Sequence, residues 1–385
     1  MAVGPLAGLG PTRCSLSCSL AGHTSGVLSA TFTRNGRFVL TTSQDKSLRL
    51  WNPHNGTHVK TYSGEHQQEV NDAVITNDNA KFFSCGSDKQ VFQWDVTTAQ
   101  VIRKFPGHDR KVNALAFGGP SQDVVLSASH DRSVRLWDLR ARSRMPIQTL
   151  DDATDSVLCV VTAGDVIITG STDGGLRQYD VRMGQLVVDH LLKPIGSICL
   201  SNGNECALVS TLDDTIRLID RETGNELAIY KGHANQRFKV QSAFAPSGSC
   251  VVSGSEDKRV CMWELVDGKL LCELSEHAAP VLCTCFFEDT LVTAAADGGI
   301  MVWKTAFPSG PSVPSASFRS GGGLPVSFGK QQGRQVPVAS ARQSSYGQAL
   351  APSSPELAEN REVEGDPDVA RGSKRGDRGK KRRRK

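Results

Sequence analysis

One short segment recurs along this chain at a nearly constant spacing, and this repeat constrains the fold more than any other feature. Five copies end on or beside tryptophan: LRLWN (48–52), VFQWD (91–95), VRLWD (134–138), VCMWE (260–264) and IMVWK (300–304). Two variant copies, LRQYD (176–180) and IRLID (216–220), fill the gap before the fourth tryptophan. Consecutive copies lie 40–44 residues apart, the spacing of one four-stranded propeller blade. The repeat therefore predicts seven blades.

An aspartate stands six residues before the anchor of every copy. The seven are Asp45, Asp88, Asp131, Asp173, Asp213, Asp257 and Asp297. Each lies in a short polar turn between two runs of β-branched or apolar residues, which is typical of a hairpin. The flanking runs alternate, as in Leu48 and Leu50 around Arg49, and this period of two indicates half-buried strands.

Together, the anchors and the turn aspartates resemble the WD-repeat family over about residues 12–306. In that family a histidine at the blade entrance, a second-strand Ser or Thr, the turn Asp and the third-strand Trp form a buried hydrogen-bonded tetrad. Residue by residue, the resemblance implies five structural tetrads: His23, Thr41, Asp45 and Trp51; His66, Ser84, Asp88 and Trp94; His108, Ser127, Asp131 and Trp137; His233, Ser253, Asp257 and Trp263; and His277, Thr293, Asp297 and Trp303. The fourth repeat keeps Thr169 and Asp173 and the fifth only Asp213, so we expect these two blades to be the softest.

These polar groups have a structural explanation. An indole N–H, a hydroxyl or an imidazole that is buried unpaired costs about 1–3 kcal/mol, and the tetrad pairs them with one another. A His/Ser/Asp set also occurs in hydrolases, but an active site is needed once and this set recurs five times. No other catalytic signature fits its context, so we expect no enzyme activity, no cofactor and no metal.

The fold class predicted is all-β, a seven-bladed WD-repeat β-propeller closed by an N-terminal strand. The repeat pattern stops at Phe307, which leaves the seventh blade without its outermost strand. Thr12–Leu20 can supply that strand and so remove the open edge of the ring. The expected propeller domain is 12–307, after a flexible N-terminus at 1–11.

Composition argues against a membrane protein and against a disulfide scaffold. No run approaches the ~18–20 apolar residues of a membrane span, and the N-terminus does not look like a secretory signal. The eleven cysteines lie mostly in strand-like segments without metal-ligand spacing, so we interpret them as reduced, buried apolar residues. A monomeric propeller inside the cell is expected.

The C-terminal part differs sharply in composition from the repeats. Residues 308–370 are rich in Ser, Gly and Pro and include an acidic patch, which predicts a disordered linker. The formal net charge of the chain is +4, yet 371–385 alone hold ten Lys or Arg against Asp377. This basic tail is interpreted as a nuclear-import signal, with nucleus favoured over cytoplasm and non-specific RNA contact as an alternative use. The signal comprises Lys380, Lys381, Arg382, Arg383, Arg384 and Lys385.

A binding function follows from the fold, and two classes of partner remain open. Five stretches (48–64, 101–108, 180–186, 211–236 and 251–270) resemble members of the family that organise a mitogen-activated protein kinase cascade and associate with the spliceosome. That resemblance implies a scaffold whose partners are splicing factors, kinase-cascade components or both. The expected partner-binding face comprises Gln44, Glu69, Asn71, Lys111, Asn113, His130, Lys239, Gln241 and Glu256.

The alternative is a substrate receptor of a cullin-RING ubiquitin ligase. Trp137-Asp138-Leu139-Arg140 resembles the WDxR box with which such receptors dock on the ligase adaptor, and Tyr179-Asp180-Val181-Arg182 is a weaker copy. An exposed Arg at an ordinary strand end explains both sequences equally well, and fold analogy is a weak warrant for function.

Overall fold

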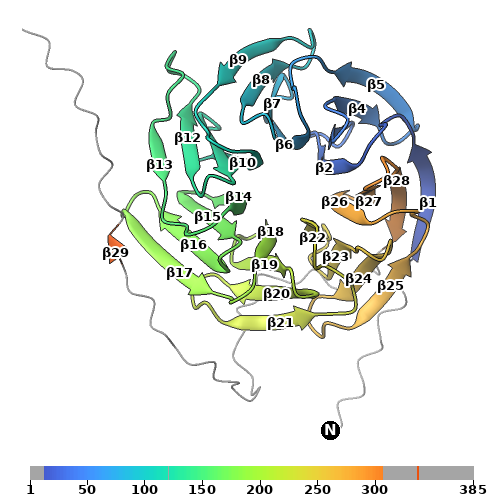
Figure 1. The fold of residues 1–385 in the computed structure, drawn as a ribbon. Helices are drawn as coiled ribbons and strands as arrows, with labels where there is room; N and C mark the ends of the chain where they lie inside the picture. The colour runs from blue at the N-terminus through green and yellow to red at the C-terminus, as the bar shows by residue number, and fades with distance from the viewer. Residues whose placement is uncertain (1–12, 120, 307–335, 338–385) are drawn as a thin grey trace, which may run out of the picture. The chain divides into compact units, whose positions relative to one another are not determined.

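The strands of this chain form seven antiparallel sheets that stand side by side in a ring (Figure 1). The computed structural model describes residues 13–119, 121–306 and 336–337. The chain divides into two units, Met1–Ala341 and Arg342–Lys385, and all described residues belong to the first. Every regular element among them is a β-strand. The predicted all-β, seven-bladed propeller is therefore confirmed.

The first four blades follow one another along the chain, and each runs in sequence order from its first to its fourth strand. Blade one contains β2 (Val27–Phe32), β3 (Val39–Ser43), β4 (Leu48–Asn52) and β5 (Thr57–Tyr62). Blade two contains β6 (Val70–Ile75), β7 (Lys81–Gly86), β8 (Val91–Asp95) and β9 (Val101–Phe105). Blade three contains β10 (Val112–Gly118), β11 (Val124–Ser129), β12 (Val134–Asp138) and β13 (Gln148–Leu150). Blade four contains β14 (Val157–Ala163), β15 (Val166–Ser171), β16 (Gly175–Asp180) and β17 (Gln185–His190).

The last three blades complete the ring. Blade five contains β18 (Ile195–Leu200), β19 (Cys206–Thr211), β20 (Thr215–Asp220) and β21 (Glu226–Tyr230). Blade six contains β22 (Ser242–Phe244), β23 (Cys250–Gly254), β24 (Val260–Glu264) and β25 (Leu270–Leu274). Blade seven contains β26 (Val281–Phe287), β27 (Thr290–Ala295), β28 (Ile300–Ala306) and, as its outermost strand, β1 (Arg13–Leu20).

Closure of the ring by the N-terminal strand is confirmed. β1 pairs antiparallel with β28 from Arg13↔Ala306 to Leu20↔Ile300. Leu20 is buried in the apolar layer between blades seven and one, together with Val27 and Trp51. The two ends of the repeat array therefore share one sheet, and β1 covers the edge that β28 would otherwise expose.

The core consists of layers between neighbouring blades rather than one central cluster. The layer between blades one and two, for example, packs Leu40, Leu50 and Tyr62 against Phe82 and Trp94. All five tryptophans are buried third-strand residues, and in the variant repeats Tyr179 and Ile219 are buried in their place. The seven anchors predicted from spacing therefore occupy one structural position.

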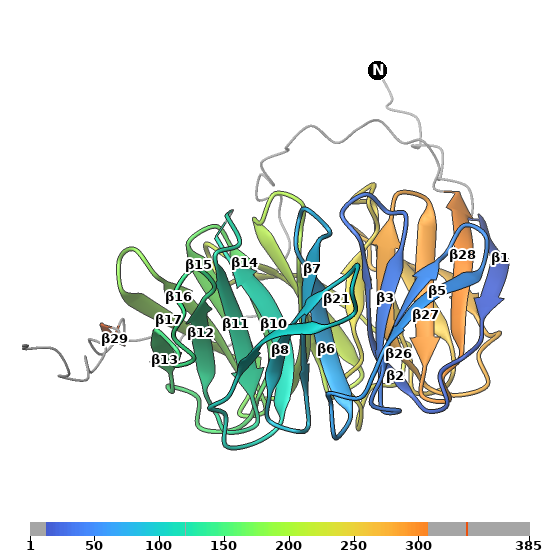
Figure 2. The same cartoon turned by 90° about the horizontal axis from the view of Figure 1, so that it is seen from above.

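The turns between strands are divided between the two faces of the ring (Figure 2). One face carries the loop that enters each first strand and the turn between each second and third strand. Because the turn aspartates lie there, we call it the aspartate face. The other face carries the turns between third and fourth strands.

One short pairing was not predicted. β29 (Val336–Pro337) lies beside the outer strand of blade four, with Leu186↔Val336 and Gln185↔Pro337 in register. Its residues fall in 308–370, where composition predicted no strand. The other predictions for 1–11, the linker, its acidic patch and the basic tail lie outside the described residues.

Candidate functional site

The turn aspartates cap their own hairpins in every blade. In six blades Oδ1 accepts the backbone N–H two residues further on, at 2.8–3.2 Å, and in blade five it accepts the Thr215 hydroxyl at 2.5 Å. The residue after each aspartate has a positive φ of 61–91°, so the seven turns share one conformation. An aspartate side chain stabilises such a turn by itself. The seven aspartates therefore have a local role that does not depend on histidine.

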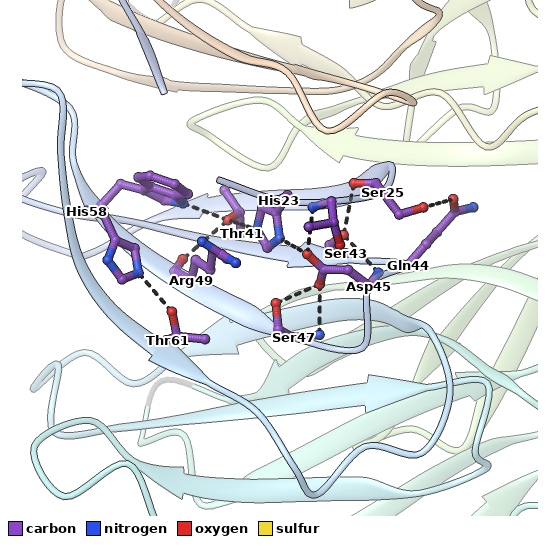
Figure 3. A network of polar contacts seen from close by, with 12 residues as sticks. His23, Ser25, Thr41, Ser43, Gln44, Asp45, Ser47, Arg49, His58 and Thr61 are labelled. Atoms are coloured by element: carbon purple, nitrogen blue, oxygen red, sulfur yellow. Dashed lines mark hydrogen bonds and ion pairs between the residues drawn. The ribbon is translucent and has the colours of Figure 1, made fainter. Parts of the chain in front are cut away.

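Blade one shows how the second carboxylate oxygen is used (Figure 3). His23 Nδ1 lies 2.7 Å from Asp45 Oδ2, and its Nε2 lies 2.8 Å from Thr41 Oγ1. Trp51 Nε1 donates to the same hydroxyl at 2.9 Å. A carboxylate only accepts, so Nδ1 carries the proton and Nε2 accepts from the threonine O–H. In the blade-one tetrad, both ring nitrogens of His23, the Thr41 hydroxyl and the Trp51 N–H therefore all have hydrogen-bond partners.

Burial and hydrogen bonding act in opposite directions on the titration of this group. Burial lowers the pKa of His23, although the hydrogen bond to Asp45 opposes that shift. Burial raises the pKa of Asp45, but hydrogen bonds from Ser47 and His23 outweigh it and hold the pKa below its ordinary value. The neutral imidazole is thus a structural donor and acceptor, with its reactive nitrogens both occupied.

Blades two and three repeat this geometry. The His66 and His108 Nδ1 atoms lie 2.7 and 2.8 Å from their aspartates, and both Nε2 atoms lie 2.7 Å from a serine hydroxyl. Trp94 and Trp137 donate to those hydroxyls at 2.8 and 2.9 Å. In each of these blades the histidine joins the entry loop to the hairpin.

Blade seven assembles only the inner half of the tetrad. His277 Nε2 lies 2.7 Å from Thr293 Oγ1, and Trp303 Nε1 donates to that oxygen at 2.9 Å. Asp297 acts on the histidine through electrostatic attraction alone, which does not offset burial, and the pKa of His277 falls to about 4.

The fourth predicted tetrad, His233, Ser253, Asp257 and Trp263, is not assembled. Trp263 Nε1 donates to the Lys231 carbonyl, Ser253 donates to the Gly254 carbonyl, and both ring nitrogens of His233 lack a hydrogen-bond partner. The entry loop explains this difference. Six residues (234–239) separate His233 from Val240, against three between histidine and valine in blades one to three and seven. With this longer loop the His233 ring packs edge-on against Trp263, with 5.4 Å between the ring centroids, and neither ring nitrogen reaches a hydrogen-bond partner.

Arginine replaces histidine as the partner of the turn aspartate in blades four to six. Arg177 Nη2 lies 2.7 Å from Asp173 Oδ2, and Arg217 Nη2 lies 2.9 Å from Asp213 Oδ2. Burial raises the pKa of Asp213, but hydrogen bonds from Arg217 and its threonine neighbours bring it down to about 2. These arginines were missed at the sequence level. In blades four and five their signal is an Arg four residues after the Asp in a repeat that lacks the histidine, whereas in blade six Arg259 stands two residues after Asp257.

The predicted partner-binding face contains three kinds of residue. Gln44, Glu69 and Lys111 are exposed, and Asn71, His130, Lys239, Gln241 and Glu256 are half-buried. Asn113 is buried and donates to the Val157 carbonyl of blade four at 2.7 Å. The prediction is therefore corrected for Asn113, which joins two blades and does not face solvent. Asn71 makes the corresponding 2.7 Å contact with the Val112 carbonyl of blade three.

Lys239 and Glu256 organise the long entry loop of blade six. Glu256 Oε1 accepts the backbone N–H groups of residues 236–238 at 2.6–2.9 Å. Lys239 reaches from this loop to blade three and donates to the Asn113 carbonyl at 2.9 Å. Residues 236–239 of the loop are thus held in place, and the loop presents Phe238 to solvent with 41 % of its surface exposed.

A buried carboxylate that the sequence analysis did not single out joins three blades. Asp72 accepts from Ser29 Oγ of blade one at 2.8 Å and from Leu115 N of blade three at 3.0 Å. Its position, two residues after the first-strand valine, varies among the repeats, so the repeat pattern gave no signal for it.

The WDxR-like box has its arginine in solvent. Arg140 is 70 % exposed and lies 3.4 Å from Asp138 and 3.8 Å from Asp123. The corresponding Arg182 of blade four is 78 % exposed. Both arginines are therefore accessible, while Trp137 is buried in the third tetrad.

Two neighbouring blades enclose a small cavity. The cavity between blades one and two, lined by Leu50, Tyr62 and Phe82 among others, has a volume of about 110 Å³, below the roughly 300–1,000 Å³ of ligand pockets. Among residues 13–119, 121–306 and 336–337, no group of three or more His, Cys, Asp or Glu could hold a metal ion. No helix in that part of the chain is long and apolar enough to cross a membrane. The six residues predicted to form a nuclear signal, 380–385, lie outside the described residues.

Comparison with known proteins gives the repeat a family. The model of the WD domain, G-beta repeat, matches residues 14–52, 56–95, 99–138, 144–180, 224–264 and 268–304. The chain is 44 % identical over 275 residues to WD repeat domain-containing protein 83 of Homo sapiens. The aligned region covers 71 % of this chain and 86 % of the human protein. The Rattus norvegicus protein of the same name is 43 % identical over 274 residues, with the same coverage. A Dictyostelium discoideum homolog is 33 % identical over 321 residues, 75 % of this chain and 98 % of its own length.

Proposed function

This chain belongs to the WD40 repeat family, whose propellers generally bind proteins, and we propose that it is a non-enzymatic scaffold that assembles proteins on its aspartate face. The observation that carries the proposal is how the polar groups are divided. The tetrads of blades one to three use their histidine, hydroxyl and indole groups on one another, while Gln44, Glu69 and Lys111 remain exposed on the same face.

The partners proposed are splicing factors, components of a mitogen-activated protein kinase cascade, or both. Support comes from the sequence resemblance to scaffold members of the family that serve those assemblies. The basic 380–385 segment supports import into the nucleus, and its lysines and arginines would also allow non-specific contact with RNA phosphates. We therefore propose action in nucleus and cytoplasm, with the nucleus as the main site.

A second candidate is docking on the adaptor of a cullin-RING ubiquitin ligase. It is favoured by the exposure of Arg140 and Arg182 at matching positions of neighbouring blades. This docking would use the face opposite the turn aspartates, so the two candidates depend on different surfaces.

Affinity purification of the full chain from nuclear extract tests both. Splicing factors or kinase-cascade proteins should be recovered with the wild type and lost with the double variant Glu69→Lys, Lys111→Glu. The matched control is Glu222→Lys, Lys269→Glu, which reverses two exposed charges in the turns of the other face and should retain them. Recovery of the cullin adaptor, abolished by Arg140→Ala, would replace the scaffold proposal by the second candidate. Recovery of none of these proteins would reject both.

A further inference from the structure

Three sulfur atoms meet where the ring closes. β25 and β1 are successive outer strands along the rim (Figure 1). Cys14 Sγ on β1 lies 3.6 Å from Met262 Sδ on β24, and Met262 pairs in register with Cys272 on β25. Cys14 and Cys272 both pack against the apolar layer between blades six and seven. Two thiols that are far apart in the sequence therefore share one small site.

The two thiols interact directly. A hydrogen bond from the Cys14 thiol to the Cys272 sulfur lowers the pKa of Cys272 and raises the pKa of Cys14. A thiolate is the form that reacts with oxidants, and a second thiol in contact can resolve the oxidised product. The direction of the pKa shift favours Cys272 as the attacking cysteine, and Met262, which contacts Cys14 and lies opposite Cys272, places the second thiol beside it.

Other cysteines of the propeller lack this combination. Cys85, Cys261 and Cys283 are fully buried, and burial raises the pKa of each thiol. Cys14 and Cys272 are only half-buried, so a small oxidant can reach the pair from the rim.

We propose that Cys14 and Cys272 form a reversible disulfide when the protein meets a hydroperoxide, and that this bond fastens the closing strand β1 to blade six. The Cys272 thiolate attacks the peroxide O–O bond, takes one oxygen to become a sulfenic acid and releases an alcohol, or water from hydrogen peroxide. The Cys14 sulfur then attacks the Cys272 sulfur and displaces water. Two thiols are oxidised, one hydroperoxide is reduced, and both thiol protons leave with the products.

The bond would change what holds the ring shut. β1 is hydrogen-bonded to β28 of blade seven, whereas blades six and seven meet through side chains of an apolar layer. A covalent link across that layer ties β1 to the neighbouring blade as well, so the strand cannot detach until the bond is reduced. The ring would then open less often in the oxidised protein.

The test is peroxide treatment of the full chain, followed by non-reducing peptide mapping and amide hydrogen exchange. The expected result is a peptide pair linked through Cys14 and Cys272, reversed by dithiothreitol, with exchange of the β1 amides slowed by about tenfold. Cys14→Ser and Cys272→Ser should each abolish the link and the slowing. Cys18→Ser, on the same strand as Cys14, and Cys285→Ser, on β26 of the same blade, are matched controls that should keep both. Thermal unfolding of each reduced variant establishes that it is folded.

Three outcomes would overturn the proposal. Cys14 and Cys272 could be oxidised or alkylated separately without a link between them. Cys14 could be joined instead to Cys18, to Cys250 or to a second molecule. The expected disulfide could also form and leave β1 exchange unchanged, which would show that it does not fasten the strand.

Discussion

Blades one to three and blades four to six hold the same turn aspartate in different ways. In the first group a histidine from the entry loop reaches the carboxylate across at least 22 residues of sequence, as His23 does to Asp45. In the second group the partner is an arginine that follows the aspartate in the same hairpin, as Arg177 follows Asp173. Histidine ties the entry loop to the hairpin, whereas these arginines lie within the hairpin itself. The aspartate is therefore common to all blades, and the histidine tether is not.

Both kinds of blade depend on a closed ring, in which every blade has two neighbours. Deleting residues 1–20 removes β1, its ladder to β28 and the buried Leu20. We expect the largest effect of any change considered, a loss of about 5 kcal/mol or more, because blade seven then exposes an unpaired edge and part of its core. Thermal unfolding measures the loss.

Deletion of 1–12 is the control, since it leaves Arg13–Leu20 intact and should preserve the thermal midpoint. If both truncated chains unfolded at the thermal midpoint of the full chain, closure by β1 would contribute nothing to the stability of the ring.

Removing the arginine of blade four tests the second type of tether. Arg177→Met leaves the Asp173 carboxylate, whose side chain is only 12 % exposed, without its cation. A buried ion pair that loses one partner typically costs about 3–5 kcal/mol, and we expect about 3 because Thr154 and Gly175 still donate to the carboxylate. Denaturant unfolding measures the change.

Blade three offers the matched substitution. Arg135 occupies the corresponding position, but its aspartate is already paired with His108. Arg135→Met should therefore cost no more than about 1 kcal/mol. Equal losses for the two variants would mean that the arginine acts through packing in both blades and does not replace histidine.

The central hydroxyl distinguishes an assembled tetrad from an unassembled one. Ser127→Ala in blade three leaves Trp137 Nε1 and His108 Nε2 without their buried partner, and should cost about 2 kcal/mol. Ser253→Ala in blade six removes only a bond to the Gly254 carbonyl, and should cost about half as much or less. Urea unfolding of the two variants measures both losses of stability. A larger loss for Ser253→Ala than for Ser127→Ala would contradict the observed arrangement of blade six.

The sequence predicted the blades better than their internal contacts. Spacing placed all seven anchors on third strands because a hairpin fixes its own register, and each aspartate is held by its own turn. The tetrad of blade six failed because a contact between an entry loop and a hairpin depends on loop length as well as on residue type. His233, Ser253 and Trp263 are all present, and the entry loop has three extra residues; His233 packs on Trp263, but the hydrogen bonds of the tetrad do not form.

The candidate binding face was predicted in outline only. Its position follows from topology, because entry loops and second-to-third turns must lie at the same end of the strands. Whether a given side chain faces solvent or a neighbouring blade depends on contacts between blades, which the repeat pattern does not encode. Asn113 was predicted to lie on the exposed binding face, and Asp72 was part of no prediction. The side chains of both residues join neighbouring blades.

The titration of His277 gives the finest test of the comparison. Its folded-state pKa of about 4 lies below the ordinary value of about 6.5. Between these values the unfolded chain binds a proton at this residue that the folded chain does not, so folding becomes less favourable as the pH falls. The stabilisation is fully present above about pH 6.5, and about 2 kcal/mol of it should be lost between pH 7 and pH 5.

The aspartate contact sets the size of this loss, and His23 provides the comparison. Asp45 accepts a hydrogen bond from His23 and opposes the effect of burial on its pKa, whereas Asp297 gives His277 only electrostatic attraction. His277→Gln should therefore flatten the dependence of unfolding free energy on pH more than His23→Gln does. If wild type and His277→Gln lost stability in parallel between pH 7 and pH 5, the half-assembled tetrad would not be the group that titrates. The difference between complete and incomplete tetrads would then concern geometry alone.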